Sequence, residues 1–333
     1  MTATTGGTPL PLTKKDFTSD QEVRWCPGCG DYAILSTVQS YLPSLGIPRE
    51  NVVFVSGIGC SSRFPYYVDT YGMHSIHGRA PAIATGLAVS RPDLKVFVVT
   101  GDGDGLSIGG NHLLHALRRN VNITILLFNN QIYGLTKGQY SPTSEFGKIT
   151  KSTPMGSLDV PFNPISLVLG AEASFVARSI DTDRAHLTSV LTAAAAREGS
   201  AFIEIYQNCN IFNDNAFQAM KDPASRDAQT IRMVHGEPLR SATTSVIRGP
   251  GGLMLVDDPA HPDAVIHDAH SVDPSFAFAL SRLKAPTPIG VFRDVPRTSY
   301  DRLMGDQLAA ARERQGRGDL ASLLAGNDTW TVA

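Results

Sequence analysis

The sequence predicts an α/β protein built on a mostly parallel β-sheet with helices on both faces. Short apolar, β-branched runs recur along the chain, end in glycine-rich loops and alternate with helical patterns. Strands that are buried on both faces have near-continuous apolar sequences, and their alternation with helices is typical of parallel sheets. Ligands bind such sheets at the carboxyl ends of the strands. The glycine-rich loops are therefore the first place to look for a functional site.

The predicted elements alternate in type over the first two thirds of the chain. In chain order they are strands at 51–55 and 94–100, a helix at 106–119, strands at 121–128 and 175–177, a helix at 183–197 and a strand at 201–206. The first strand leads into a loop at 56–60 that contains two glycines and Cys60. The second leads into Gly-Asp-Gly-Asp-Gly at 101–105, and the third closes on Asn129-Asn130. Because all these loops follow strands, we expect them at one edge of the sheet.

Composition divides the chain into three segments. Residues 1–24 are polar and turn-rich, without the apolar stretch of a signal peptide. Residues 25–217 carry the alternating pattern and the motifs described below. From 218 to 333 the pattern loosens, with Gly and Pro breaks at 249–252 and 259–262 and helices predicted near 274–284 and 299–315. We expect this C-terminal extension to pack on the main domain or on a partner subunit.

Charge and cysteine content narrow the class of protein. The net charge is −2 and Lys and Arg are spread along the chain, which argues against nucleic acid or an anionic membrane as a partner. No stretch is apolar enough to span a bilayer, and four cysteines do not suggest a disulfide framework, so we expect a cytoplasmic protein. Charged residues make up 18%, below the usual value of about 25%. This low fraction hints that a partner subunit covers part of the surface.

The loop at 101–105 and the Asn-Asn pair together predict a site for a diphosphate held through Mg²⁺. Mg²⁺ prefers hard oxygen ligands, of which proteins commonly supply few. Asp102 offers a carboxylate, Asn130 an amide oxygen and Ile132 a backbone carbonyl. Each half of the motif alone could be an ordinary turn or strand end, but here one helix and one strand separate them, with 25 residues (104–128) between. A dinucleotide site is the weaker alternative, because the glycines lack the G-x-G-x-x-G spacing.

The cysteines leave several interpretations open. Cys26 and Cys29 form a C-x-x-C loop, whereas Cys60 and Cys209 follow predicted strands. Four converging thiolates suit a [4Fe–4S] cluster or a structural zinc ion, although zinc sites more often use two compact pairs. A thioredoxin-like dithiol would leave Cys60 and Cys209 unexplained. The simplest alternative is one reactive pair with two buried core cysteines.

Several separated motifs, in order over residues 24–215, resemble the β subunits of 2-oxoacid:ferredoxin oxidoreductases. In addition, Gly-Asp-Gly at 101–103 followed by Asn129-Asn130 resembles the signature of thiamine diphosphate enzymes. The motifs are Trp25-Cys-Pro-Gly-Cys-Gly-Asp31, Ser56-Gly-Ile-Gly-Cys-Ser-Ser62, His77-Gly-Arg-Ala80, Gly101-Asp-Gly-Asp-Gly105 with Gly109-Gly-Asn-His112, and Tyr133-Gly-Leu-Thr-Lys-Gly-Gln139 with Ser141-Pro-Thr143. The resemblance implies the thiamine diphosphate-binding fold.

The resemblance also implies roles for particular residues. All four cysteines would bind a [4Fe–4S] cluster, and Asp102, Asn130 and the Ile132 carbonyl would hold Mg²⁺. Lys137, Arg63, His77 and Leu135 would serve catalysis. Leu135 and Lys137 would face the substrate, while His77 would line the thiamine and Arg63 would hold a carboxylate. Arg63 stands where relatives often carry lysine, which keeps the charge but changes its reach. The residues implied to bind the cofactor are Gly57, Ile58, Gly59, Cys60, Ser61, His77, Gly101, Asp102, Gly103, Asp104, Asn130, Ile132, Tyr133, Gly134, Leu135 and Thr136.

The implied reaction is the coenzyme A-dependent oxidative decarboxylation of a 2-oxoacid to acyl-CoA and CO₂, with electrons passing through the cluster to ferredoxin. The segment 133–143 is more similar to the 2-oxoglutarate and broad 2-oxoacid branch than to the pyruvate branch, and Lys137 and Arg63 could meet a distal carboxylate. Only the diphosphate-binding half of a thiamine site is present, so the resemblance implies an α subunit in an αβ or α2β2 assembly. The alternatives are a pyruvate or broad-range enzyme, a non-oxidative thiamine enzyme subunit, and a non-catalytic metal-binding subunit.

Overall fold

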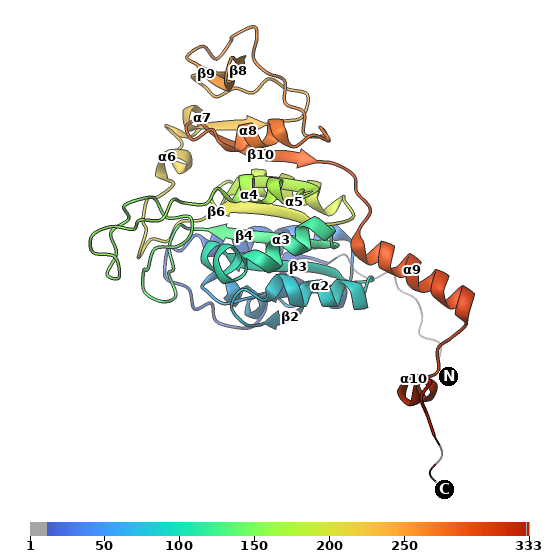
Figure 1. Ribbon diagram of the computed structural model, residues 1–333. Helices are drawn as coiled ribbons and strands as arrows, with labels where there is room; N and C mark the ends of the chain where they lie inside the picture. Colours follow the sequence, from blue (N-terminus) through green and yellow to red (C-terminus); the bar gives the residue numbers. More distant parts are fainter. Residues whose placement is uncertain (1–11, 331, 333) are drawn as a thin grey trace.

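An eight-stranded sheet forms the centre of the molecule (Figure 1). The computed structural model describes residues 12–330 and 332. Every neighbouring pair of strands is parallel except β5 and β10, which are antiparallel. Across the sheet the strands are β2 (Tyr71–His74), β1 (Val52–Ser56), β3 (Lys95–Gly101), β4 (Ile123–Asn129), β6 (Ala201–Tyr206), β5 (Phe175–Ile180), β10 (Thr287–Asp294) and β7 (Thr230–Met233).

Helices cover both faces of this sheet, which confirms the predicted architecture. On one face the sheet packs against α2 (Ala80–Ser90), α3 (Gly110–Arg119), α4 (Pro164–Gly170) and α8 (Ser275–Ser281). On the other face it packs against α1 (Asp31–Tyr41) and α5 (Arg184–Ala195). Side chains of one strand alternate between the two cores. Val53 and Val55 belong to the first core, and Val52 and Phe54 to the second. The apolar runs of the sequence are therefore strands buried on both sides.

The helix predicted over 106–119 begins only at Gly110. Before it, η5 (Asp104–Ile108) is a π turn with a kink at Ser107, whose backbone angles are φ −91° and ψ −105°. Gly109 allows the chain to pass close to the turn before α2, since a Cβ there would lie 3.0 Å from Gly78 Cα.

The segment after residue 217 adds strands to the central sheet. β7 and β10 extend the sheet beyond β5, while β8 (Ser245–Gly249) and β9 (Gly252–Val256) form a separate antiparallel pair. The predicted helices at 274–284 and 299–315 correspond to α8 and to α9 (Tyr300–Gln315). The remaining helices of this segment are α6 (Gln218–Lys221), α7 (Arg226–Gln229) and α10 (Leu320–Ala325). Figure 1 shows α9 and α10 projecting from the body of the molecule.

Short 3₁₀ helices complete the N-terminal part: η1 (Lys14–Phe17), η2 (Leu42–Leu45), η3 (Arg49–Asn51) and η4 (Ser61–Tyr66). Residues 1–11 of the predicted polar N-terminal segment lie outside the described residues. The described part of that segment is attached to the body, because Phe17 is fully buried in the core formed by α1 and α5. In the part of the chain that the structure describes, no helix combines the length and the apolar character needed to cross a membrane.

Candidate cofactor site

A cavity of about 480 Å³ opens at the carboxyl ends of β1, β3 and β4. It brings together all the predicted cofactor-binding residues except Gly57, and it adds Gln139. Gly57 lies behind the wall, where a Cβ would come within 2.2 Å of Asp104 Oδ2. The residues that line the cavity are Ile58, Gly59, Cys60, Ser61, His77, Gly101, Asp102, Gly103, Asp104, Asn130, Ile132, Tyr133, Gly134, Leu135, Thr136 and Gln139.

Asp102 is the buried carboxylate of this cavity, with 2% of its surface exposed. Its Oδ2 accepts hydrogen bonds from Ser141 Oγ at 2.5 Å and Thr143 Oγ1 at 2.6 Å. Burial raises the pKa of Asp102 to about 6, although the two hydroxyl bonds oppose this rise. Both hydroxyls donate to one oxygen and leave Oδ1 free of them. A carboxylate that is oriented in this way by neighbouring donors fits the needs of a Mg²⁺ ligand.

The opposite wall is formed by the turn after β4. Asn130 Oδ1 accepts a hydrogen bond from Ile132 N at 3.1 Å, which holds the amide at the cavity. Tyr133 donates from its hydroxyl to the Gly103 carbonyl at 3.1 Å, so the two loops touch. A Cβ on Gly103 would lie 2.1 Å from the Tyr133 ring. Glycine is therefore required at 103 by the close approach of the two loops.

The four cysteines line a second cavity, of about 330 Å³. All four are free thiols, and Cys26 is exposed. Burial raises the pKa of the Cys60 thiol to about 12 and that of Cys29 further, with Asp31 and the other cysteines adding to both shifts. Gln207 Nε2 donates a hydrogen bond to Cys29 Sγ at 3.2 Å. Thiols in such a place favour the protonated form unless metal charge compensates them.

The four cysteines reach their cavity from three parts of the chain: the Cys26–Cys29 loop, Cys60 and Cys209. Within the described ranges, no group of three or more His, Cys, Asp and Glu side chains is placed to hold a single metal ion. Four thiolates are a donor set that suits either a [4Fe–4S] cluster or a zinc ion.

The two cavities share a wall. Cys60, Asn130, Gly134 and Leu135 line both of them. The wall is thin at Gly134, where a Cβ would lie 3.4 Å from Cys60 Sγ and 3.6 Å from Cys209 Sγ. A ligand in the first cavity would therefore lie beside whatever the cysteines bind.

The residues predicted to serve catalysis are divided between the two cavities. His77 lines the first cavity, Arg63 and Lys137 line the cysteine cavity, and Leu135 lines both. Lys137 is exposed and has a left-handed φ of 80°, which few non-glycine residues adopt. The tight turn that carries it is closed by a hydrogen bond from Lys137 N to the Gly134 carbonyl at 3.0 Å.

Sequence reasoning assigned no role to four residues that build this site. Ser141 and Thr143 were noted within a motif but not as partners of Asp102. Gln139 lines the cavity and donates to the Thr136 carbonyl at 2.9 Å. Gln207 belongs to no recognised motif. Side-chain chemistry alone does not reveal these contacts, because the residues come together only through the tertiary fold.

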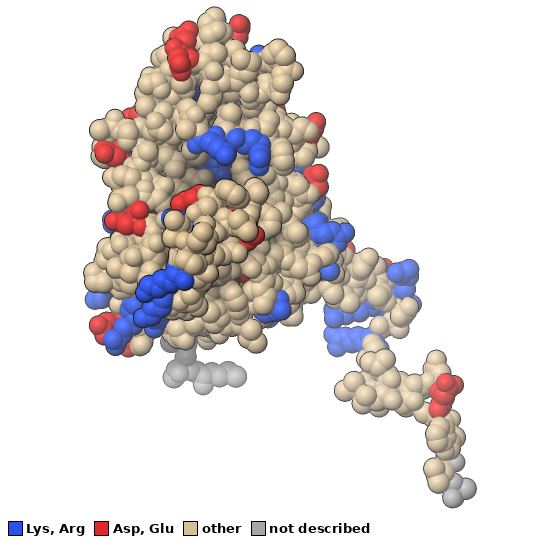
Figure 2. Space-filling model, turned by 60° about the vertical axis from the view of Figure 1, so that its left-hand side comes forward, with Lys and Arg blue, Asp and Glu red and all other residues tan. Residues whose placement is uncertain are grey.

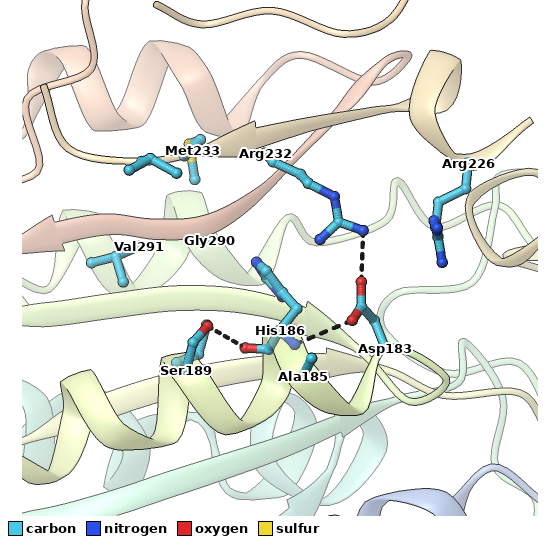
Figure 3. A pocket seen from close by; sticks show the side chains of 11 residues that line it. Asp183, Ala185, His186, Ser189, Arg226, Arg232, Met233, Gly290 and Val291 are labelled. Atoms are coloured by element: carbon cyan, nitrogen blue, oxygen red, sulfur yellow. Dashed lines mark hydrogen bonds and ion pairs between the residues drawn. The ribbon is translucent and has the colours of Figure 1, made fainter. Parts of the chain in front are cut away.

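A third cavity, of about 440 Å³, lies away from this region between α5 and β7 (Figure 3). Its carboxylate, Asp183, is already paired, since Oδ2 accepts from Arg232 Nη2 at 2.6 Å and Oδ1 from the backbone N of His186 at 3.1 Å. None of the predicted site residues lines it. We therefore place the candidate cofactor site at the carboxyl edge of β1, β3 and β4.

Residues 57–205 match the family model of the thiamine pyrophosphate enzyme C-terminal TPP-binding domain. This match covers the strands β3, β4, β5 and β6 and the first cavity. The fold and the site together thus define a thiamine diphosphate-binding protein.

Comparison with known proteins assigns the chain to a narrower group within this class. The chain is 60% identical to 2-oxoglutarate oxidoreductase subunit KorB of Mycobacterium tuberculosis, over 98% of this chain and 90% of that protein. It is 46% identical to 2-oxoacid:ferredoxin oxidoreductase 1, subunit beta, of Aeropyrum pernix, over 57% of this chain and 60% of that one. The solved 2-oxoglutarate:ferredoxin oxidoreductase of Magnetococcus marinus, with 2-oxoglutarate, coenzyme A and succinyl-CoA bound, matches with a TM-score of 0.76 and 34% identity.

The chain belongs to the family of 2-oxoacid:ferredoxin oxidoreductase β subunits. The predicted resemblance is thereby confirmed, and it extends beyond residues 24–215. The match to the Magnetococcus marinus structure covers 96% of this chain and 97% of that chain, so it includes most of the C-terminal segment.

Proposed function

We propose that this chain, with an α subunit, carries out the coenzyme A-dependent oxidative decarboxylation of 2-oxoglutarate to succinyl-CoA and CO₂ and passes the electrons to ferredoxin. One observation carries the proposal: the cavity predicted to hold thiamine diphosphate and the cavity of the four cysteines share the wall formed by Cys60 and Gly134. Oxidation of a substrate at the first site needs an electron acceptor nearby, and a cluster held by the four cysteines would be one. A non-oxidative thiamine enzyme would not need it.

The chain's own residues fit the cofactors. Asp102, Asn130 and the Ile132 carbonyl would hold Mg²⁺ on the diphosphate, and the four cysteines would hold a [4Fe–4S] cluster. The burial of Asp102 and the convergence of the thiols on one cavity support these assignments. When bound, thiamine diphosphate supplies the carbon nucleophile for decarboxylation and the cluster accepts electrons singly. The protein supplies position and charge.

Two cations favour 2-oxoglutarate over pyruvate. Arg63 and Lys137 line the cysteine cavity, next to Leu135 on the shared wall. A guanidinium and an ammonium at this position suit the distal carboxylate of 2-oxoglutarate, which pyruvate lacks. The names of the Mycobacterium tuberculosis and Magnetococcus marinus relatives, both 2-oxoglutarate enzymes, support the same choice. A pyruvate or broad-range enzyme remains the alternative that the assay below tests.

Exposed apolar side chains support the need for a partner. The connection from β4 to α4 exposes Phe146 (65%), Met155 (94%) and Leu158 (84%). This connection is on the side of the molecule that Figure 2 turns forward, where charged side chains form separate groups on a mostly uncharged surface. Apolar exposure of this extent marks contact surfaces. We propose that the α subunit covers it and completes the thiamine site, and that the complex works in the cytoplasm.

The test is anaerobic co-expression with the α subunit and an assay of coenzyme A-dependent viologen reduction, with 2-oxoglutarate and pyruvate compared. Faster turnover of pyruvate would refute the substrate assignment. Iron and sulfide analysis separates the cluster from zinc, and a complex without iron would refute the oxidative reaction. Asp102→Asn should abolish Mg²⁺-dependent cofactor binding, whereas the matched surface change Asp93→Asn should not. Full activity of Asp102→Asn would point to a non-catalytic role for this chain.

A further inference from the structure

Asp104 accepts hydrogen bonds from three separate segments of the chain. Its Oδ1 accepts from Ile58 N at 3.0 Å, Gly78 N at 2.7 Å and His77 Nδ1 at 2.6 Å. Its Oδ2 accepts from Thr100 Oγ1 at 2.6 Å. These partners come from the loop after β1, the turn before α2 and the end of β3. Only 3% of Asp104 is exposed, so it is a buried carboxylate with donors on both oxygens.

The space around Asp104 is shaped for this carboxylate. A Cβ on Gly57 would lie 2.2 Å from Oδ2, so the backbone of the first loop closes directly on it. Gly78 has φ +72°, and a Cβ there would lie 2.6 Å from Gly109 N. The turn that carries His77 is thereby held against the η5 turn that carries Asp104. Backbone contact and hydrogen bonds thus fix the position of His77 together.

The bond to Asp104 also determines which nitrogen of His77 faces the cavity. A carboxylate oxygen can only accept hydrogen bonds, so the Nδ1 atom that contacts it carries the hydrogen and donates. Nε2 then lies on the far side of the ring. His77 lines the first cavity, and 37% of its side chain is exposed. His112, one of two histidines in α3, lies 2.8 Å from Arg79 Nη1 through its Nε2. His77 is therefore the imidazole that can reach a ligand in the cavity.

We propose that Asp104 is a positioning residue that acts through His77: it holds the imidazole with Nε2 toward the cofactor cavity, and turnover depends on that orientation. The proposal rests on the proposed function. Groups that orient a side chain in an active site commonly change rates by about 10- to 100-fold when removed. Because Asp104 acts through His77, its contribution to kcat should vanish when residue 77 is no longer a histidine.

A double-mutant cycle in the assembled complex tests this. His77→Asn keeps an amide near the place of Nδ1 but removes the group at Nε2. Asp104→Ala should lower kcat by about 10- to 100-fold in the wild-type background and leave KM for the 2-oxoacid nearly unchanged. In the His77→Asn background the same change should lower kcat no further. Multiplicative losses would overturn the proposal, because they would show that Asp104 acts independently of His77.

Asp104→Asn is the conservative variant. Its amide oxygen can still accept from Ile58 N, Gly78 N and His77 Nδ1, so it should retain most of the turnover that Asp104→Ala loses. Loss of turnover as large as in Asp104→Ala would count against orientation as the cause. Asp93→Ala, a change of an exposed carboxylate, is the matched control and should leave turnover unchanged.

A crystal structure of the Asp104→Ala complex supplies a readout that does not depend on activity. The His77 ring should turn away from its wild-type orientation, and an unchanged ring would overturn the proposal. An inactive wild-type complex would instead refute the proposed function, while the orientation of His77 could still be read from this structure. The two failures are therefore distinguishable.

Discussion

The buried ion pair between Arg178 and Glu204 allows a stability prediction that is independent of the reaction. Arg178 Nε donates to Glu204 Oε2 at 2.7 Å, and the two side chains are 3% and 0% exposed. Burial lowers the pKa of the Arg178 guanidinium, but the charges of Glu204 and Tyr206 and the hydrogen bond to Glu204 together outweigh this and raise it. Glu204 Oε1 also accepts from Asn129 Nδ2 at 2.7 Å. The pair thus connects β5 and β6 to the end of β4, next to Asn130.

Arg178→Met should cost about 3–5 kcal/mol of the free energy of unfolding, because it leaves the Glu204 carboxylate buried with one neutral donor. This corresponds to about two to four orders of magnitude in the unfolding equilibrium constant. Urea unfolding followed by circular dichroism measures the change. In the double variant Arg178→Met/Glu204→Met, most of the loss should be recovered, since apolar replacement of a buried pair is often neutral.

The exposed pair Arg91–Asp93 is the matched control. Its side chains are 56% and 53% exposed, so Arg91→Met should cost less than about 1 kcal/mol. The reasoning fails if Arg178→Met is no more destabilising than Arg91→Met. It also fails if the double variant is as unstable as the single one, because the cost would then not come from the unpaired carboxylate.

Three further predictions concern single residues. Gly103→Ala places a Cβ 2.1 Å from the Tyr133 ring and should weaken thiamine diphosphate binding measured by calorimetry. Gly110→Ala, at a position with open space around it, should not weaken binding. Equal affinities of the two variants would contradict the close approach of the two loops. Cys209→Ser should lower the iron content of the anaerobically purified complex, and unchanged iron would remove Cys209 from the ligand set. Burial lowers the pKa of His186 to about 4, so between pH 6.5 and about 4 the unfolded state binds a proton that the folded state does not. The free energy of unfolding should therefore decrease as the pH is lowered through this range. His186→Asn should flatten this dependence of the urea midpoint, and an identical slope would refute the assignment.

Burial on both faces made the central strands predictable. β1, β3, β4 and β6 are mostly apolar runs, which can be recognised as strands without knowing which strands lie beside them. β10 was missed because Pro288 and Gly290 lie inside it, and both residues are unusual in strand interiors. β2 was missed because all four of its residues are exposed, which leaves no apolar run.

The candidate site, like the fold, has one part that the sequence predicts and one part that it does not. The loops around Asp102 and Asn130 were predictable because parallel strands bring their carboxyl ends to one edge. The role of Asp104 was not, because two of its partners are the backbone N–H groups of Ile58 and Gly78. Every residue type except proline offers such a donor, so the sequence carries no sign of the contact.

The antiparallel insertion of β10 has a consequence for synthesis of the chain on the ribosome. The sheet can form from β2 to β5 once Tyr206 has emerged, but β10 begins only at Thr287, 81 residues later (287 − 206). At about 5–20 residues per second, the outer edge of β5 stays unpaired for about 4–16 s. An unpaired edge in the middle of a future sheet invites pairing with other chains. We expect the nascent chain to need chaperone protection during this interval, and slower translation to lower its yield.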